Sequence, residues 1–300
     1  MIEIKGVSKS FGDIIANDNI SLQIMESEIV GLIGPDGAGK TTLMRQLCAL
    51  SHPDQGNIHI DAYDTVKNQY EVRSMIGYMP QRFSLYPDLT IEQNLLFFAN
   101  LFNTPKKGRQ ERLEQLYKFS NLKPFQNRQA GKLSGGMKQK LALSCNLIHT
   151  PKYLFLDEPT FGVDPVSRQE FWELIKQLRD EGLTVFVSTP YLDEANTFDK
   201  LALIFNGKIL AYKTPEKIVD SYSDQIFVMQ SENYDYFAKM QNVKYLYLFN
   251  KELYISFSEA PRQEEWQTWL DNKVINGYNQ KQITLEDVFL MQNKHIVSQI

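Results

Sequence analysis

A glycine-rich segment at residues 34–42 contains the residue types that bind the phosphates of a nucleotide. Its sequence, GPDGAGKTT, fits the pattern G-x-x-x-x-G-K-S/T at Gly34, Gly39, Lys40 and Thr41. Glycines let the backbone turn its N–H groups toward phosphate oxygens, and the helix expected to open at Lys40 adds the positive end of its dipole. The apolar run directly before the segment indicates a buried strand. The segment therefore has the strand, loop and helix order of a phosphate-binding loop.

The pattern assigns a role to each part of this loop. Lys40 is expected to reach the terminal phosphates, and the Thr41 hydroxyl to bind Mg²⁺. The alternative, a glycine-rich turn before an ordinary helix, is disfavoured by the strand before it and the helix after it. We predict nucleotide contacts along the whole segment: Gly34, Pro35, Asp36, Gly37, Ala38, Gly39, Lys40, Thr41 and Thr42.

Further motifs follow this loop in a fixed order along the chain. They are Gln81 in YMPQ, the segment LSGGMKQK at residues 133–140, the apolar run YLFLDEP with Asp157 and Glu158, and Asp164 in FGVDP. Together with the phosphate loop, these motifs resemble the ATP-binding cassette (ABC) family of ATPases. The resemblance covers roughly residues 1–215.

The resemblance implies a catalytic and metal-binding set of residues. Asp157 would hold Mg²⁺ with Thr41, and Gln81 would contact both the metal and the attacking water. Glu158 would polarise that water as the catalytic carboxylate. In phosphoryl transfer the protein mainly positions groups and stabilises charge, and a carboxylate beside the water suffices. The implied ligands are ATP and Mg²⁺.

Ser134, Gly135 and Gly136 form a second candidate anion site. Serine is a good N-cap, and the glycines leave the backbone amides of the helix start unobstructed. By resemblance, this site faces the γ-phosphate held by the other protomer of a head-to-tail dimer, so that ATP joins two chains. The alternative is an ordinary capped helix.

Phe11 lies in the context SKSFG, between strands expected at residues 1–7 and 19–25. In the resembled family an aromatic residue at this place stacks on adenine. Stacking suits this role because a ring adds apolar area without demanding hydrogen bonds. The alternative is that Phe11 belongs to the hydrophobic core.

One position departs from the family pattern. After the apolar run at residues 183–188 the family usually has a histidine that contacts the γ-phosphate, and this chain has Pro190 there. Proline offers neither a side-chain donor nor a backbone N–H. The four histidines of the chain all lie outside this loop: His52, His59, His149 and His295. Two explanations stay open: Thr189 or water replaces the imidazole, or the site is slow.

The expected fold is α/β: a P-loop NTPase of the ABC type with an antiparallel β edge and a helical insert at about residues 86–150. Thr90 begins a capping box in that insert. The ATPase domain is expected at residues 1–222, with a boundary in the polar stretch 220–224. A small α+β accessory domain is expected at residues 223–300, with strands at residues 225–230, 243–249 and 252–257. Its tail, ITLEDVFL, resembles the end of ATPase subunits from exporters whose permease is a separate chain.

Composition narrows the choice of compartment and partner. The formal net charge of −4 argues against nucleic acid as the main ligand, because that binding relies on clustered lysine and arginine. Cys48 and Cys145 are expected to be buried thiols without a disulfide partner. The sequence has neither a signal-peptide pattern nor an apolar run long enough to span a membrane. We therefore expect a cytoplasmic chain that reaches the inner face of the membrane through a partner.

The sequence thus predicts the ATP-binding and hydrolysing subunit of an ABC exporter, which energises separate permease subunits by ATP-driven closure of a dimer. Homodimer and heterodimer both stay open. The exposed segment at residues 82–89 is the expected contact with the permease. One alternative, suggested by Pro190, is a hydrolysis-poor partner in a heterodimeric transporter. Another is an ABC ATP switch that acts on a soluble complex.

Overall fold

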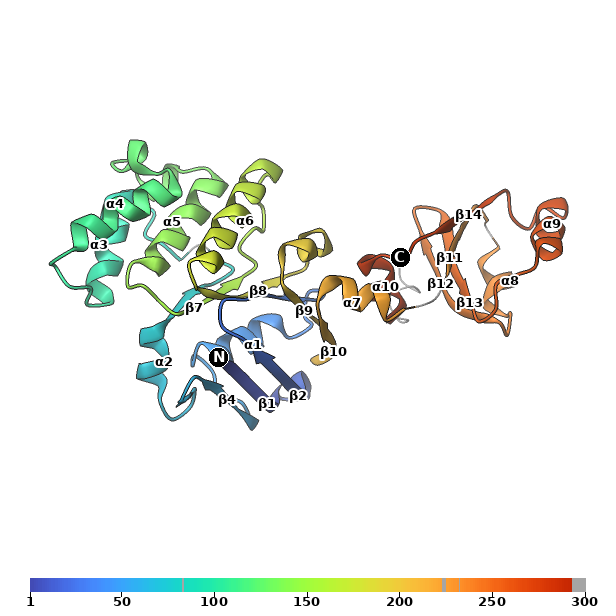
Figure 1. Cartoon of the computed structure of the whole chain (residues 1–300), viewed down its shortest axis with the longest axis horizontal. Coiled ribbons are helices and arrows are strands. Elements are labelled where there is room, and N and C mark those ends of the chain that lie inside the picture. Colours follow the sequence, from blue (N-terminus) through green and yellow to red (C-terminus); the bar gives the residue numbers. More distant parts are fainter. Residues whose placement is uncertain (83, 223–224, 232, 293–300) are drawn as a thin grey trace. The chain divides into compact units, whose positions relative to one another are not determined.

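The computed structural model describes residues 1–82, 84–222, 225–231 and 233–292 (Figure 1). The chain divides into two compact units, Met1–Tyr212 and Lys213–Ile300. This division comes earlier than the boundary expected at residue 222, because helix α7 (Pro215–Asp220) contacts α10 (Leu285–Gln292) of the second unit.

The centre of the first unit is a six-stranded sheet in the order β10-β9-β3-β8-β7-β6. Its strands are β3 (Ile29–Ile33), β6 (Ile76–Met79), β7 (Tyr153–Asp157), β8 (Thr184–Thr189), β9 (Lys200–Phe205) and β10 (Lys208–Lys213). Strands β6, β7, β8, β3 and β9 pair in parallel. Every residue of β3, β7 and β8 is buried, as expected for parallel strands covered on both faces. The carboxyl ends of parallel strands meet at one edge, where such folds place ligands.

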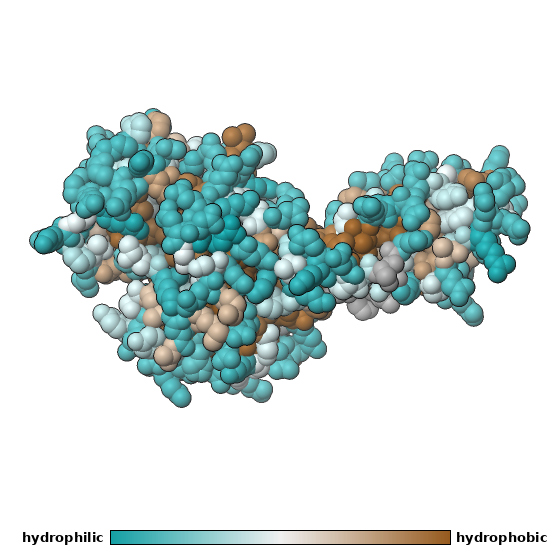
Figure 2. All heavy atoms as spheres, viewed as in Figure 1, coloured by the Kyte–Doolittle hydropathy of each residue, from teal (hydrophilic) through white to brown (hydrophobic). Residues whose placement is uncertain are grey.

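The antiparallel edge predicted from the sequence is a second sheet, in the order β2-β1-β4-β5. It consists of β1 (Ile2–Phe11), β2 (Ile14–Ile24), β4 (Gln55–Ile60) and β5 (Tyr63–Asp64). The first two strands are longer than predicted, because irregular pairing carries the hairpin beyond Val7 as far as Phe11. Helix α1 (Lys40–Leu47) contacts both β2 and β7, and its Leu43 and Leu47 belong to the same hydrophobic core as Ile2. The face of the molecule drawn in Figure 2 is mainly hydrophilic, with smaller hydrophobic areas.

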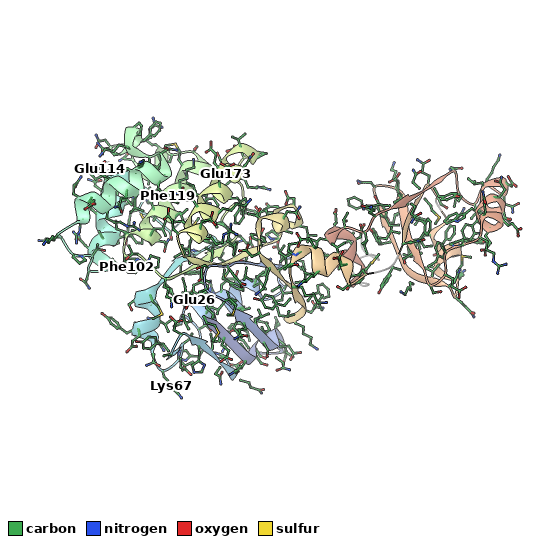
Figure 3. All side chains as sticks on the ribbon, in the orientation of Figure 1. Glu26, Lys67, Phe102, Glu114, Phe119 and Glu173 are labelled. Atoms are coloured by element: carbon green, nitrogen blue, oxygen red, sulfur yellow. The ribbon has the colours of Figure 1, made fainter. Side chains whose placement is uncertain are left out.

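The predicted helical insert contains α3 (Ile91–Leu101), α4 (Arg109–Ser120) and α5 (Gly135–Leu147), and Figure 1 shows these helices grouped together. Both α3 and α4 contact α5. The capping box is confirmed: Gln93 N–H donates to Thr90 Oγ1 at 3.1 Å, and Thr90 N–H donates to Gln93 Oε1 at 2.9 Å. Phe102, labelled in Figure 3, stacks on His149 with ring centroids 3.8 Å apart. Helix α2 (Gln69–Met75) precedes the insert, and α6 (Pro165–Asp180) follows it.

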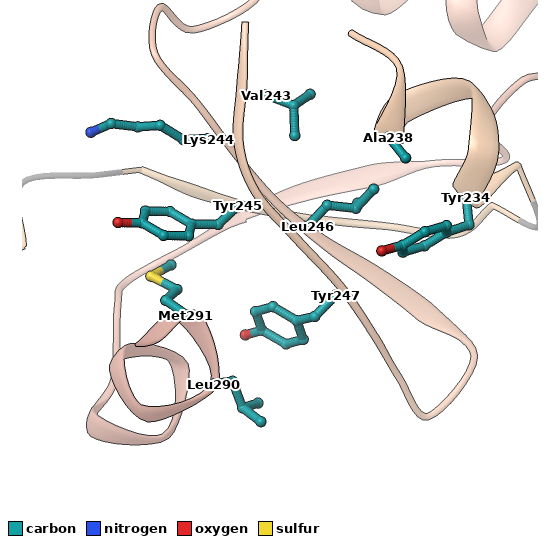
Figure 4. Close-up of a pocket in the computed structure, with 9 residues that line it drawn as sticks. All are labelled: Tyr234, Ala238, Val243, Lys244, Tyr245, Leu246, Tyr247, Leu290 and Met291. Carbon is teal, nitrogen blue, oxygen red and sulfur yellow. The ribbon is translucent and has the colours of Figure 1, made fainter. Parts of the chain in front are cut away.

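The second unit has the predicted α+β character. Its sheet has the order β12-β13-β11-β14, with β11 (Ile226–Met229), β12 (Val243–Phe249), β13 (Glu252–Phe257) and β14 (Tyr278–Lys281). Helices α8 (Tyr234–Ala238) and α9 (Gln263–Asp271) accompany it. Trp266 and Trp269 pack with Phe257 in its buried aromatic core. A cavity of about 250 Å³ is lined by residues of α8, β12 and α10, which Figure 4 shows as sticks.

The tail motif ITLEDVFL has a structural explanation in this unit. Asp287 is buried and accepts hydrogen bonds from Tyr247 Oη at 2.6 Å, Lys281 Nζ at 2.9 Å and the Thr284 N–H at 2.7 Å. These donors outweigh the effect of burial and lower the pKa of the Asp287 carboxyl. The aspartate therefore attaches the start of α10 to the sheet.

Candidate functional site

The phosphate loop has the close backbone approach that its glycines predict. A Cβ atom added at Gly34 would lie 2.2 Å from the Ile204 carbonyl oxygen, and one at Gly39 would lie 2.0 Å from the Ala16 carbonyl oxygen. Gly39 also has a φ of 101°, which L side chains rarely adopt. No side chain caps α1, which begins at Lys40. The loop is therefore a glycine-lined cradle that ends at a helix N-terminus able to receive an anion.

Lys40 is buried in this cradle, with 4% of its surface exposed. Its Nζ donates to the carbonyl oxygens of Gly34 at 2.8 Å and Pro35 at 3.0 Å. It also lies 3.4 Å from Glu158 Oε1. The structure thus places the predicted phosphate-binding cation beside the predicted catalytic carboxylate.

Glu158 also accepts a hydrogen bond from Gln81, whose Nε2 lies 2.7 Å from Glu158 Oε2. Glu158 has a left-handed backbone with φ 51°, which is costly for a residue with a side chain. Its N–H donates to the Ser188 carbonyl oxygen at 3.0 Å and to Ser188 Oγ at 3.2 Å. Lys40, Gln81 and Glu158 come from distant segments of the chain and meet at this one point.

Asp157 is the last residue of β7, and it points one carboxylate oxygen at hydroxyl groups. Thr41 Oγ1 donates to Asp157 Oδ1 at 3.2 Å, and Ser188 Oγ donates to the same oxygen. Among the described residues none donates to Oδ2, which is buried. A buried carboxylate oxygen without a donor is costly, and a cation satisfies it. Thr41 and Asp157 therefore fit a magnesium ion, whereas the hydrogen bond of Gln81 goes to Glu158.

The surroundings of Pro190 bear on the explanation that Thr189 replaces the missing imidazole. Thr189 is fully buried at the end of β8, and its Oγ1 donates to Glu194 Oε2 at 2.6 Å. Because this hydroxyl is engaged with Glu194, it is a poor substitute for an imidazole on a phosphate. Replacement by water and a slow site both stay open.

Phe11 is 56% exposed, so the alternative that it belongs to the core is wrong. Lys9 Nζ lies 5.6 Å from its ring centroid. The ring lies at the tip of the β1–β2 hairpin and offers an aromatic surface to a ligand.

The predicted N-cap at the start of α5 is confirmed, whereas the anion site there stays a prediction. Ser134 is the N-cap, and its Oγ accepts from the Met137 N–H at 3.3 Å. Ser134 and Gly135 are exposed, whereas Gly136 lies so close to Ser167 that an added Cβ would come within 2.5 Å. The exposed residues are available to a second copy of the chain.

Sequence reasoning missed Ser188 and Glu194. Both are hydrogen-bond partners of predicted site residues or their neighbours. The available signal was polar residues at the end of a buried parallel strand, the edge at which such sheets bind ligands.

Within the described ranges, no helix is long and apolar enough to cross a membrane. Cys48 and Cys145 are buried free thiols, and burial raises the pKa of both.

The ABC transporter family model matches residues 17–161 of the chain. The probable multidrug ABC transporter ATP-binding protein YbhF of Escherichia coli (strain K12) is 42% identical over 233 residues, which are 77% of this chain and 40% of that protein. Nod factor export ATP-binding protein I of Burkholderia lata is 35% identical over 221 residues, which are 73% of each chain.

A solved structure agrees with these relatives. It is the dimeric, post-hydrolysis state of the ATP-binding cassette MJ0796 bound to ADP and Pi, with 28% identity and a TM-score of 0.64 over 71% of this chain and 98% of that chain. The matched region spans less than half of YbhF but nearly three quarters of the Nod factor protein. The chain therefore belongs to the ABC transporter family, as one of its ATP-binding proteins.

Proposed function

We propose that this chain hydrolyses ATP and thereby energises export through separate membrane permease subunits. The observation that carries the proposal is the contact of Lys40 and Gln81 with the two oxygens of Glu158, directly beside the glycine cradle. This arrangement puts a phosphate-binding cation, a carboxylate and an amide where a terminal phosphate would meet water. Phosphoryl transfer needs little more from a protein than such positioning and charge stabilisation.

Each residue in and around the cradle has its own role in the proposed hydrolysis. Lys40 exchanges its carbonyl partners for phosphate oxygens, and the loop amides bind the remaining oxygens. Thr41 and Asp157 would hold Mg²⁺, which when bound would supply positive charge to the phosphate groups. Glu158 accepts hydrogen bonding from the attacking water, and Gln81 fixes the orientation of that carboxylate. Phe11 stacks on the adenine.

The complete site requires a second copy of the cassette, identical or related. The exposed start of α5 at Ser134 and Gly135 binds the γ-phosphate of the partner's ATP, and the two chains close on each other. The dimeric state of MJ0796, a cassette that matches most of the first unit, supports this arrangement. Closure on ATP and reopening after hydrolysis would transmit work to the permease.

The exposed aromatic surface of the helical insert fits a permease contact. Tyr86 is 46% and Phe97 37% exposed, and their rings meet edge to face at 4.6 Å. Large exposed rings favour protein contacts. Phe83, also predicted to contact the permease, lies outside the described residues. Through this contact the chain would lie on the cytoplasmic face of the membrane. The name of the Nod factor export protein supports export as the direction of transport.

One specific observation favours a second candidate function. Pro190 offers no donor, and the hydroxyl of Thr189 is bound to Glu194. A site that lacks this donor could serve as the hydrolysis-poor partner of a second, histidine-bearing cassette. In that case ATP would bind to this chain and be hydrolysed mainly in the partner's site.

Release of inorganic phosphate by the purified chain tests the first proposal. We expect Mg²⁺-dependent turnover that Lys40→Ala abolishes, and co-purification of a multi-spanning membrane protein with the tagged chain from native membranes. Nucleotide binding without turnover would favour the hydrolysis-poor role instead. Recovery of a soluble complex and no membrane protein would contradict both transport roles.

A further inference from the structure

Glu194 is a buried carboxylate outside the predicted site. It lies in the short 3-10 helix η3 (Leu192–Thr197), and only 3% of it is exposed. Thr160 Oγ1 donates to its Oε1 at 2.6 Å, and Trp172 Nε1 donates to the same oxygen at 3.1 Å. Thr189 Oγ1 donates to Oε2 at 2.6 Å. Both oxygens are therefore satisfied by side chains.

These donors come from three segments that meet only in the folded chain. Thr160 belongs to the loop that begins at Glu158, Thr189 directly precedes Pro190, and Trp172 is on α6. A carboxylate suits this place because both of its oxygens accept hydrogen bonds, and the indole N–H can only donate. A glutamine of the same shape loses the charge that faces Arg168, and its NH₂ group would make the Thr189 hydroxyl accept a hydrogen bond instead of donating one.

Arg168 also contacts the segment that contains Glu194. Arg168 Nε lies 3.8 Å from Glu194 Oε1, and the Arg168 guanidinium lies over the Tyr191 ring at 4.6 Å. Arg168 also reaches the exposed Asp193 at 3.4 Å. Burial raises the pKa of Glu194, and the hydrogen bonds offset this effect only in part. A buried carboxylate is costly to keep without such partners.

The loop at Glu158 needs external support because its backbone is strained. A left-handed conformation at a residue with a side chain, as at Glu158 with φ 51°, is costly and persists only when the surroundings hold it. Ser188 holds the Glu158 N–H on one side. Glu194 holds Thr160 on the other side and links it to Thr189, the residue after Ser188 on the same strand.

We propose that Glu194 is a positioning residue for ATP hydrolysis, which holds Thr160 against Thr189 so that Glu158 stays aligned with Lys40 and Gln81. This inference rests on the proposed ATPase function of the site. It concerns a buried carboxylate that is bonded to Thr160, Trp172 and Thr189 and acts through the backbone of the loop that contains Glu158.

The test compares Glu194→Gln with Glu173→Gln, a matched control because Glu173 is an exposed carboxylate on α6 that accepts a hydrogen bond from Gln169 at 3.3 Å. We expect Glu194→Gln to lower kcat about tenfold, equivalent to about 1.4 kcal/mol of barrier, with KM for ATP within about twofold of wild type. Hydrogen exchange at the amides of Phe161 and Val163, which bond to the carbonyl oxygens of Glu158 and Thr160, should accelerate at least about tenfold. The control should match wild type in all three measurements.

Thr160→Val, which removes one donor to the same carboxylate, serves if Glu194→Gln does not fold. It should lower kcat similarly. The double variant should lose little more activity than either single variant, because both changes break the same hydrogen bond between Thr160 and Glu194. Faster exchange with unchanged kcat would overturn the positioning role, and unchanged exchange would overturn the contact itself. If the wild-type chain releases no phosphate, the proposed function fails, and the exchange comparison still decides whether Glu194 holds this loop.

Discussion

Lys40 Nζ and Glu158 Oε1 lie 3.4 Å apart, and both residues are almost fully buried. The group that would bind phosphate is therefore the counter-ion of the group that would activate water. Binding of a phosphate at Lys40 must change this ion pair. The contact links nucleotide binding directly to the state of the catalytic carboxylate.

Breaking this pair should destabilise the fold. Lys40→Ala leaves Glu158 buried without its cation, and loss of one partner of a buried pair costs about 3–5 kcal/mol. Removing the charge of Glu158 as well should recover part of that loss, with a coupling of about 2 kcal/mol in a double-mutant cycle with Glu158→Gln. Urea denaturation in the absence of nucleotide measures each variant. Additive losses would show that the two groups do not interact.

Local chemistry explains which parts of the fold could be predicted. The glycine loop, the capping box at Thr90 and the N-cap at Ser134 all depend on neighbours in the sequence, and the structure contains each of them. The turn between β9 and β10 likewise depends on its own two residues. Asn206 and Gly207 have φ values of 46° and 76°, as a type I′ turn requires.

Features that depend on distant partners could not be predicted in the same way. Strand β14 is polar and mostly exposed, and it pairs with β11 at the edge of the sheet, so it has no alternating apolar pattern. Glu194 gains its role only because Thr160, Trp172 and Thr189 surround it in the folded chain. The family resemblance placed Gln81 at the metal and the attacking water; its hydrogen bond to Glu158 was not predicted, since no spacing rule connects these residues.

Pro190→His tests the departure from the family pattern. A histidine would add a donor that becomes charged near neutral pH beside the γ-phosphate. We expect kcat to rise about tenfold, or about 1.4 kcal/mol of barrier, without tighter ATP binding. Pro190→Ala is the control, because it removes the ring and restores the N–H without an imidazole. An equal gain in both variants would attribute the effect to the backbone, and no gain in either would show that hydrolysis does not need the donor.

Tyr86→Glu tests the permease contact. Tyr86 is half-exposed and packs against Phe97, so a charge there should disrupt an apolar interface while the fold survives. Co-purification of the membrane partner should fall at least about tenfold, and basal ATPase should stay within about twofold of wild type. Tyr70→Glu, on α2 and 81% exposed, should have no effect on either. Retained co-purification would place the contact elsewhere, and loss of soluble protein would show that Tyr86 stabilises the fold.

Acid stability should depend on Asp61. Burial raises the pKa of this carboxyl, but hydrogen bonds from Lys152, the Met1 amino group and Tyr153 outweigh it and lower the pKa from 3.8 to about 2. The stability contributed by ionised Asp61 is therefore present above about pH 4 and is lost as the pH falls toward 2. Asp61→Asn should cost roughly 1 kcal/mol at pH 7, and its difference from wild type should shrink over that range. The exposed Asp13→Asn is the control. A difference that does not change with pH would refute the assignment.

The central claim is that ATP binds between two cassettes and that Glu158 is needed to release them. Size-exclusion chromatography with light scattering on Glu158→Gln, with and without ATP and Mg²⁺, tests it most directly. The cradle, Lys40 and the start of α5 are intact in this variant, so ATP should bind, turnover should stop and a stable dimer should accumulate. Ser134→Arg, combined with Glu158→Gln, should prevent that dimer while ATP still binds. A Glu158→Gln chain that binds ATP at saturation and remains a monomer would contradict the account.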